Sequence, residues 1–342
     1  MEHEIKRLWI KKSTKAREDW EWLLNQAHIR PEETVDYTVA MYDGDGIIAT
    51  GSLHQNVLKC IAVCKKYTGG GVINTLISHL MAEVFDRGYA SCYVYTKPDA
   101  VQSFLYLGFQ EIARVPNHLV FLEKSTKGFP IFLSELAKEK QEGKNIAGIV
   151  MNANPFTLGH QYLVEKASKE NDVVHVFVLS EDLSVFPSDI RMQLVKKGTE
   201  HLKNVFVHGT GDYMVSAKTF PSYFLREDAN VTEIQARLDA IIFRDHIAPS
   251  LAINRRYVGD EPYSFATNIY NGALEAEFAG SLELLIISRK EAEKEVISAS
   301  RVRALIKENK TTETESLLPK TTYQFLLTED GKKIIQRIQQ KE

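Results

Sequence analysis

The sequence predicts an α/β protein of two modules, the second of them built on a parallel sheet. Its 342 residues exceed the size at which a single hydrophobic core usually stops growing. Both halves alternate short apolar runs with stretches of helical periodicity. The second half has the order strand, helix, strand, which is typical of parallel sheets because parallel strands need a long crossover.

The first module, residues 1–127, is predicted to contain a hairpin followed by a strand, a glycine loop and a helix. The turn of the hairpin has the sequence Gly-Asp-Gly. Apolar residues recur at helical spacing from Val72 to Val84, directly after the glycine loop. The predicted elements are strands 37–42, 47–53 and 58–64, helix 72–84, strand 91–95, helix 100–106 and strand 119–122.

Residues 128–144 are a predicted connector that carries one helix. The segment contains Gly128, Pro130 and a charged run from Lys138 to Lys144. The second module, residues 145–342, follows it. Its predicted elements are strand 146–151, helix 158–168, strand 172–179, helix 191–202, strands 205–207 and 282–287, and a helix near residue 302.

Composition and charge exclude several classes of protein. Hydrophobic residues make up 44% and charged residues 25%, which is ordinary globular usage. The formal net charge of -3 gives no general attraction to nucleic acid. The N-terminus lacks an apolar core of signal-peptide length, and no run approaches a membrane span, so we expect a cytoplasmic protein with no membrane partner. Cys60, Cys64 and Cys92 lie in apolar runs and are expected to be reduced thiols.

The strongest chemical motif is residues 152–160, between a predicted strand and a predicted helix. Ligands of open α/β sheets bind at this position. Gly159 lets backbone approach a phosphate, and His160 and Thr157 can donate hydrogen bonds to an α-phosphate oxygen. The alternative is that the Thr-x-Gly-His string is only a loop-to-helix junction. The candidate nucleotide-binding residues here are Asn154, Pro155, Phe156, Thr157, Gly159 and His160.

A second motif, residues 297–303, again precedes a predicted helix. Serines at this position can cap the helix, and an arginine follows within the first turns. Taken alone, these residues are an ordinary N-cap and a solvated charge. Two helix N-termini in one module that could each bind a phosphate favour a nucleotide site. The candidate residues here are Ile297, Ser298, Ser300 and Arg303.

Together, the Thr-x-Gly-His and Ile-Ser-x-Ser-x-Val-Arg strings resemble the paired signatures of the nucleotidyltransferase superfamily, which implies a Rossmann-like second module. The resemblance implies that Thr157 and His160 hold the α-phosphate of ATP. It also implies that Ser298, Ser300 and Arg303 hold the β- and γ-phosphates and the departing pyrophosphate. Mg²⁺ is then expected to bind largely through the phosphates, without a protein ligand.

Two other segments of this module are weaker candidates for the nucleotide site. Arg191 stands where relatives often begin a helix with an arginine near the nucleotide, although a surface charge explains it equally well. Residues 255–262 match the segment that forms the adenine and ribose wall in relatives. Within it, Gly259 and Glu261 are the candidates.

The first module resembles GNAT acetyltransferases. Residues 66–71 match their basic-x-x-Gly-x-Gly loop, in which N–H groups at a helix start hold the pyrophosphate of CoA. This resemblance implies that Lys66, Gly69 and Gly71 bind a CoA-like arm, whereas a plain glycine loop is the alternative. Tyr106 matches a position from which relatives often protonate a leaving thiolate, although a core tyrosine is the commoner explanation.

Longer stretches, residues 209–225 and Tyr270–Asn271, narrow the resemblance to the citrate lyase ligase family, which shares the order of the two modules. The resemblance covers nearly the whole chain. It implies that acetate and ATP give acetyl-adenylate and pyrophosphate. The acetyl group then passes to the thiol of a dephospho-CoA-type group on the acyl carrier subunit of citrate lyase, which activates the lyase.

Two other functions remain open from the sequence. One is a GNAT protein acetyltransferase with a nucleotide-sensing module, and the other is an adenylyltransferase for a phosphorylated pantetheine-like metabolite. Dependence of the reaction on acetate distinguishes the ligase from these two functions. The residue that pairs with the acid carboxylate is also open, because Lys218, Arg255 and Arg256 are each more often solvated charges.

Overall fold

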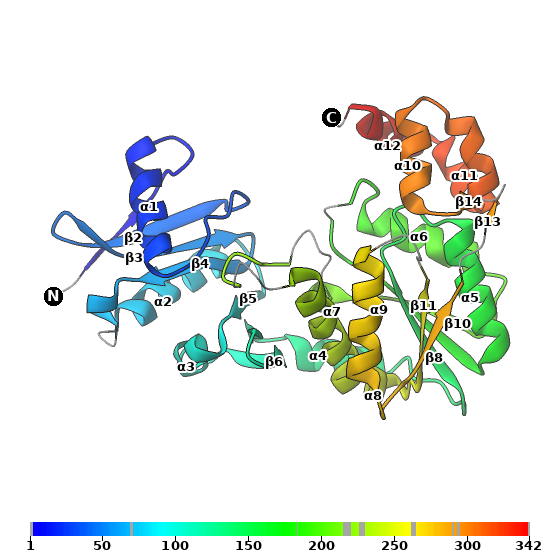
Figure 1. Ribbon diagram of the computed structural model, residues 1–342, viewed down its shortest axis with the longest axis horizontal. Helices are drawn as coiled ribbons and strands as arrows, with labels where there is room; N and C mark the ends of the chain where they lie inside the picture. The colour runs from blue at the N-terminus through cyan, green and yellow to red at the C-terminus, as the bar shows by residue number, and fades with distance from the viewer. Residues whose placement is uncertain are drawn as a thin grey trace. The chain divides into compact units, whose positions relative to one another are not determined.

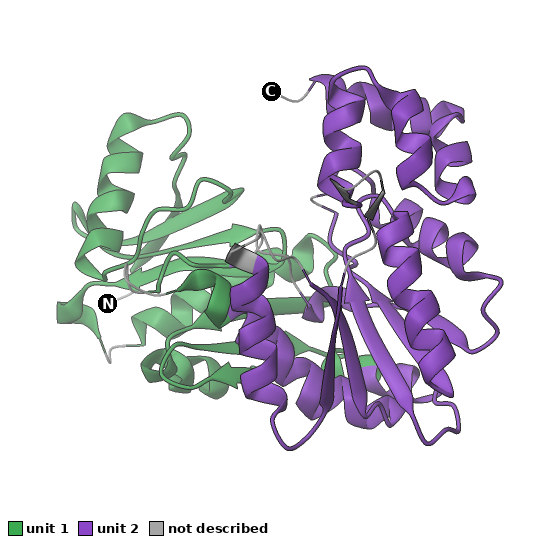
Figure 2. Ribbon diagram, turned by 45° about the vertical axis from the view of Figure 1, so that its right-hand side comes forward, with its two compact units in different colours: residues 1–132, 221–234 green, residues 133–220, 235–342 purple. Residues whose placement is uncertain are grey.

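The computed structural model describes residues 3–68, 71–182, 184–214, 220–225, 230–260, 265–288, 291–292 and 295–340. The chain forms two compact units (Figure 2). Unit 1 comprises residues 1–132 and 221–234, and unit 2 comprises residues 133–220 and 235–342. The chain therefore leaves unit 2 after residue 220, contributes a short segment to unit 1, and returns to unit 2 at residue 235.

The described part of the first 137 residues contains seven strands and several short helices (Figure 1). The elements are β1 (Glu4–Arg7), α1 (Thr14–Gln26), β2 (Tyr37–Asp43), β3 (Gly46–His54), β4 (Val57–Val63), η1 (Lys65–Tyr67), α2 (Val72–Asp86), β5 (Ser91–Thr96), η2 (Pro98–Ala100), α3 (Val101–Tyr106), β6 (Gln110–Val115), β7 (Leu119–Ser125) and α4 (Phe129–Ala137). The predicted hairpin is confirmed as β2 and β3, whereas β1, α1 and β6 were not predicted.

Unit 1 is organised by one sheet in the order β1-β2-β3-β4-β5-β7-β6. Neighbouring strands are antiparallel except β4 and β5, which run parallel and pair only at Val57 with Tyr93 and Leu58 with Val94. Helix α2 packs its buried leucines against β3, where Gly51 leaves the room that Leu80 occupies. The short β4–β5 ladder means that few main-chain hydrogen bonds join the two halves of this sheet.

The three cysteines are free thiols, as the sequence predicted. Cys60 on β4 and Cys92 on β5 are buried, and Cys64 is half-buried. Burial raises the pKa of Cys60 and of Cys92 to about 12. Both buried thiols are therefore protonated and unreactive at neutral pH.

The remainder of the chain alternates strands and helices. Its elements are β8 (Ile146–Met151), α5 (Leu158–Glu170), β9 (Val173–Val178), α6 (Ser188–Thr199), β10 (Val205–Gly209), η3 (Gly211–Tyr213), α7 (Val231–Ile242), η4 (Phe243–Ile247), α8 (Ala248–Leu251), β11 (Arg255–Gly259), α9 (Phe265–Phe278), β12 (Glu283–Ile287), β13 (Glu291–Ala292), β14 (Glu295–Val296), α10 (Ala299–Lys307), η5 (Thr311–Leu317), α11 (Lys320–Leu326) and α12 (Glu329–Gln340). Of these, β11 was not predicted to be a strand.

Unit 2 contains a five-stranded, fully parallel sheet in the order β10-β9-β8-β11-β12. The chain builds outward from β8 to β10 and then returns to place β11 on the other side of β8. This reversal makes the carboxyl ends of β8 and β11 the switch point of the sheet, where ligands of such folds bind. The predicted α/β class with a parallel second sheet is confirmed.

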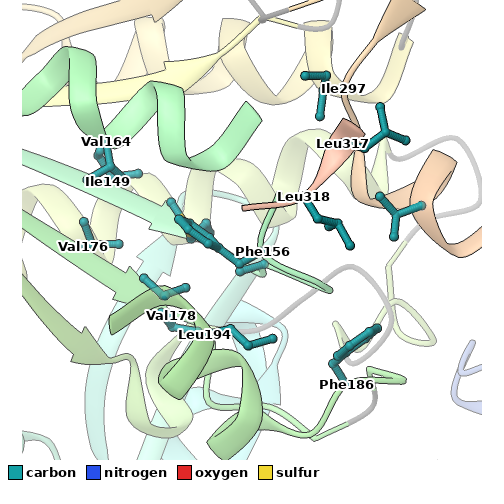
Figure 3. Packing of buried hydrophobic residues seen from close by; sticks show 14 of the residues in the cluster. Ile149, Phe156, Val164, Val176, Val178, Phe186, Leu194, Ile297, Leu317 and Leu318 are labelled. Atoms are coloured by element: carbon teal, nitrogen blue, oxygen red, sulfur yellow. The ribbon is translucent and has the colours of Figure 1, made fainter. Parts of the chain in front are cut away.

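Helices cover both faces of the parallel sheet (Figure 1). On one face, α5, α6 and the helices after α10 enclose a core that includes Phe156, Leu194 and Ile297 (Figure 3). On the other face, Phe243 packs over Gly148, whose missing side chain makes room for the ring. Among the described residues, no helix is both long and apolar enough to cross a membrane.

Candidate nucleotide site at the edge of the parallel sheet

Helix α5 begins with a capping arrangement made by Thr157 and His160. The backbone N–H of Thr157 donates to His160 Nδ1 at 3.1 Å, and the backbone N–H of His160 donates to Thr157 Oγ1 at 3.4 Å. A backbone N–H can only donate, so Nδ1 is the unprotonated nitrogen of the neutral ring. The ring proton is therefore on Nε2, and the imidazole is fixed in orientation with Nε2 as its donor.

The start of α10 has its own cap and approaches the start of α5 closely. Ser298 Oγ accepts a hydrogen bond from the backbone N–H of Arg301 at 3.1 Å. A Cβ atom on Gly159 would lie 2.9 Å from the backbone oxygen of Ile297, which is too close for an unshifted chain. Glycine at this position thus lets the two motifs of the sequence meet.

Arg303 ties the second motif to the loop that precedes α5. Its Nη1 donates to the backbone oxygen of Asn154 at 2.5 Å, and its Nη2 donates to Ser300 Oγ at 3.1 Å. Burial lowers the pKa of Arg303. An arginine in these contacts remains charged, so it places a cation beside the loop.

Arg191 is buried rather than a surface charge of α6, so the surface interpretation is wrong. Its guanidinium donates to the backbone oxygens of Phe186 and Asn152, each at 3.0 Å, and of Leu179 at 2.6 Å, and it also bonds Glu181 O. These contacts join the loops that follow β8 and β9. In this structure Arg191 therefore positions the loops around the site.

A cavity of about 200 Å³ lies at the carboxyl ends of β8 and β11. It is lined by part of the predicted set, namely Thr157, Gly159, His160, Gly259, Ile297 and Ser298. Sequence reasoning gave no nucleotide role to several other lining residues, including Asn152, Tyr162, Thr267, Tyr270 and Asn271. Tyr162 had a signal that could have found it, because it lies three residues after Gly159 on the same helix and so on the same face.

Other predicted residues surround the cavity without lining it. Phe156 is fully buried in the core of unit 2, and the Oδ1 of Asn154 accepts a hydrogen bond from the backbone N–H of Phe186 at 3.1 Å. Pro155 lies between them in the same loop, and Ser300 is exposed. Three residues fall outside the described part of the chain: Gly69, Lys218 and Glu261. Within the described part, no group of three or more His, Cys, Asp or Glu side chains is suited to hold a metal ion.

The glycine loop of unit 1 leads into α2 without a side-chain cap. Gly71 precedes the helix with a positive φ of 78°, and no side chain of the described residues accepts a hydrogen bond from the first-turn N–H groups. Lys66 is exposed in η1. Tyr106 is 80% exposed, so the interpretation as a core tyrosine is wrong.

A second cavity, of about 480 Å³, lies in unit 1 beside the short β4–β5 ladder. Its walls include Val63 of β4, Thr96 of β5, and Tyr223 and Phe224 of the segment 220–225. Arg30 fixes this segment, because its backbone N–H donates to Tyr223 O at 2.9 Å and its Nη2 donates to Ser222 O at 2.5 Å. Tyr223 and Phe224 therefore supply a wall of the unit 1 cavity, a role that no sequence signal indicated.

Comparison with known sequences identifies relatives over most of the chain. Residues 146–326 match the family described as the citrate lyase ligase C-terminal domain. The [citrate [pro-3S]-lyase] ligase of Escherichia coli is 33% identical over 309 residues, which is 89% of this chain and 88% of that protein. The Klebsiella pneumoniae protein of the same name is 33% identical over 94% of this chain and 96% of its own length.

Solved structures resemble parts of the chain. A putative nicotinate-nucleotide adenylyltransferase from Vibrio parahaemolyticus aligns with 58% of this chain and 97% of its own, with 18% identity and a TM-score of 0.36. The ribosomal-protein-S18-alanine N-acetyltransferase of Escherichia coli aligns with 36% of this chain and 94% of its own, with 18% identity and a TM-score of 0.31. Neither similarity is close enough to support a residue-level comparison.

Proposed function

Because the chain belongs to the citrate lyase ligase family, we propose that unit 2 uses ATP to activate acetate as acetyl-adenylate. The acetyl group then passes to the thiol of the dephospho-CoA-type group on the acyl carrier subunit of citrate lyase. The products are the acetylated, active lyase, AMP and pyrophosphate. Acetate is a poor acyl donor until its oxygen is attached to AMP, which is a leaving group of low basicity.

The observation that carries the proposal is the close approach of Gly159 to Ile297. It brings the capped start of α5 beside the capped start of α10, on the cavity at the switch point of the sheet. Helix starts attract phosphates through their N–H groups and the helix dipole. Two of them at one cavity suit the α-phosphate and the pyrophosphate of a single nucleotide.

In the first step, an acetate oxygen forms a bond to the α-phosphorus, and the bond to the oxygen that bridges to the β-phosphate breaks. His160 Nε2 and Thr157 Oγ1 stabilise the charge that develops on the α-phosphate oxygens. Ser298, Ser300 and Arg303 bind the pyrophosphate as it leaves. Mg²⁺ would be carried mainly by the phosphates and would supply further charge neutralisation there.

In the second step, the thiol sulfur attacks the acetyl carbonyl, loses its proton, and expels AMP. Unit 1 holds the pyrophosphate arm of the thiol-bearing group at the start of α2, with Lys66, Gly69 and Gly71. The absence of a side-chain cap on the described first turn of α2 supports this role, because its N–H groups are left for a ligand. Unchanged transfer kinetics after replacement of Gly69 and Gly71 by bulky residues would exclude it.

The proposed function is tested by acetate-dependent ATP–pyrophosphate exchange with the purified chain and magnesium, without any thiol acceptor. Exchange that requires acetate supports acyl-adenylate formation. Exchange that requires a phosphorylated pantetheine-like acceptor instead supports the metabolite adenylyltransferase. Consumption of acetyl-CoA without ATP supports a GNAT acetyltransferase and contradicts the proposal.

A further inference from the structure

Arg256 is a buried cation whose hydrogen-bonding capacity is only partly used. It lies in β11 opposite Gly148 of β8, and only 1% of its surface is exposed. In the part of the chain that the structure describes, its Nε and Nη1 have no hydrogen-bond partner. A buried guanidinium with unsatisfied donors is energetically costly, so the position suits an anion supplied from outside the chain.

The groups around Arg256 do not supply a fixed counter-charge. The ring of Phe243 lies 4.2 Å from the guanidinium carbon, and Tyr270 shares a hydrogen bond with Arg256. Asp239 is also close and shares a hydrogen bond with Tyr270, but among the described residues its Oδ1 has no partner. Burial raises the pKa of Asp239 to about 7, so near neutral pH this carboxyl is protonated for much of the time.

Arg256 is one of the residues that line the cavity shared by His160 and Ser298. Val258, two residues further along β11, points to the same face of the sheet and also lines the cavity. The cavity thus combines a cation with an apolar wall. A small carboxylic acid has the matching features, an anionic group and a short alkyl group.

The neighbouring arginine has a different role. Arg255 Nε donates to Glu283 Oε2 at 2.8 Å, and its Nη1 donates to Asn171 Oδ1 at 3.2 Å. Adjacent residues of a strand point to opposite faces, which explains why only one of the pair reaches the cavity. Arg255 therefore offers a matched control on the same strand.

We propose that Arg256 binds the carboxylate of the acid substrate and orients it for attack on the α-phosphorus. The inference rests on the proposed function of unit 2. The guanidinium donates to one carboxylate oxygen, and the other oxygen forms the new bond to phosphorus while pyrophosphate leaves with the electron pair of the broken bond. The carboxylate has no proton to lose, so the step needs no general base.

The test uses the full-length chain and initial rates of ATP–pyrophosphate exchange, with acetate and ATP varied separately. In Arg256→Met, the KM for acetate should rise about 10- to 100-fold while the KM for ATP stays unchanged, because a charge-assisted contact to acetate is lost. Arg256→Lys should give a smaller rise, since an ammonium lacks the planar fork of donors. Arg255→Gln should change neither KM.

A KM for acetate that is unchanged in Arg256→Met, or a rise in both KM values together, would overturn the inference, since Arg256 would then be structural or contact the nucleotide. Thermal melts of each variant show whether it folds. If Arg256→Met does not fold, an unchanged KM for acetate in Arg256→Lys overturns the inference. Absence of acetate-dependent exchange in the unmodified chain rejects the proposed function itself, which distinguishes the two failures.

Discussion

The helix starts of α5 and α2 differ in how they are built, although each follows a strand and a loop of the same unit. At α5, Thr157 and His160 bond each other and fill part of the first turn with side-chain atoms. At α2, Gly71 provides the turn and no side chain bonds the described first-turn N–H groups. Side-chain donors fixed at a helix start can stabilise a charge that develops on a phosphate, and backbone N–H groups left free at a helix start can bind a phosphate.

Under the proposed function, the chemistry belongs to unit 2 and the thiol-bearing group is held by unit 1. Substitutions at α5 should therefore act on nucleotide exchange, and substitutions at α2 should act only on the transfer to the thiol.

The largest effect is expected for His160→Ala. Loss of the Nε2 donor should reduce acetate-dependent exchange by about 10²- to 10³-fold, the usual cost of a missing donor to a developing oxyanion. The matched variant His160→Gln keeps an acceptor for the Thr157 N–H and so preserves the helix cap, yet exchange should stay low. Exchange at the unmodified rate in His160→Ala would refute the role of this residue.

A smaller loss is expected for Gly159→Ala. The new Cβ would lie 2.9 Å from Ile297 O, so the start of α10 must move away from α5. Misplacement of the phosphate-binding groups should lower exchange on the order of 10- to 100-fold. Gly272→Ala, a helical glycine with nothing within 4 Å of the added atom, is the control and should leave exchange unaltered.

Gly71→Asp tests the other side of the comparison. Aspartate tolerates a positive φ and caps helices well, so unit 1 should remain folded. Its charge should repel a pyrophosphate and raise the KM for the thiol-bearing carrier subunit by about tenfold, without change in exchange. Gly71→Asn has the same shape without the charge and should show a weaker effect. An equal KM for the carrier subunit in the unmodified chain, Gly71→Asp and Gly71→Asn would contradict a role of unit 1 in binding the carrier.

The smallest effect concerns the stability of unit 2, where His175 and His208 are hydrogen-bonded at 2.9 Å. Burial lowers the pKa of both to about 4. Because the unfolded chain protonates these rings near pH 6.5, the stability they contribute is present above pH 6.5 and is lost as the pH falls to 4. Between these pH values, the Tm of His208→Asn should fall less than that of the unmodified chain, and a parallel fall would show that the pair does not contribute.

The sequence predicted the placement of both phosphate motifs because each follows a strand and opens a helix, which is a local pattern. The sequence pattern did not predict the strand β11, because this strand begins with two consecutive arginines. A strand with Arg256 on one face and Arg255 on the other has no apolar signature, and only the neighbouring strands reveal that Arg256 is buried.

Arg191 shows a second limit of predicting contacts from the sequence. Apart from Asn152 Oδ1, its partners are backbone oxygens of two loops, and the identity of a residue carries no information about where its backbone oxygen points. A nucleotide contact or a surface charge were the natural interpretations of its position in the sequence. Likewise, the wall that Tyr223 and Phe224 give to the unit 1 cavity depends on a path of the chain that periodicity does not encode.

That path also determines how the protein can be divided. The segment from residue 221 to 234 belongs to unit 1 although it lies in sequence between two parts of unit 2. A polypeptide that begins at residue 145 would keep Tyr223 and Phe224. It would lose Arg30 and the other residues of unit 1 that bury these two rings. Such a fragment would expose two aromatic side chains to water and be prone to aggregate, so the two halves of this enzyme are expected to depend on each other for solubility as well as for catalysis.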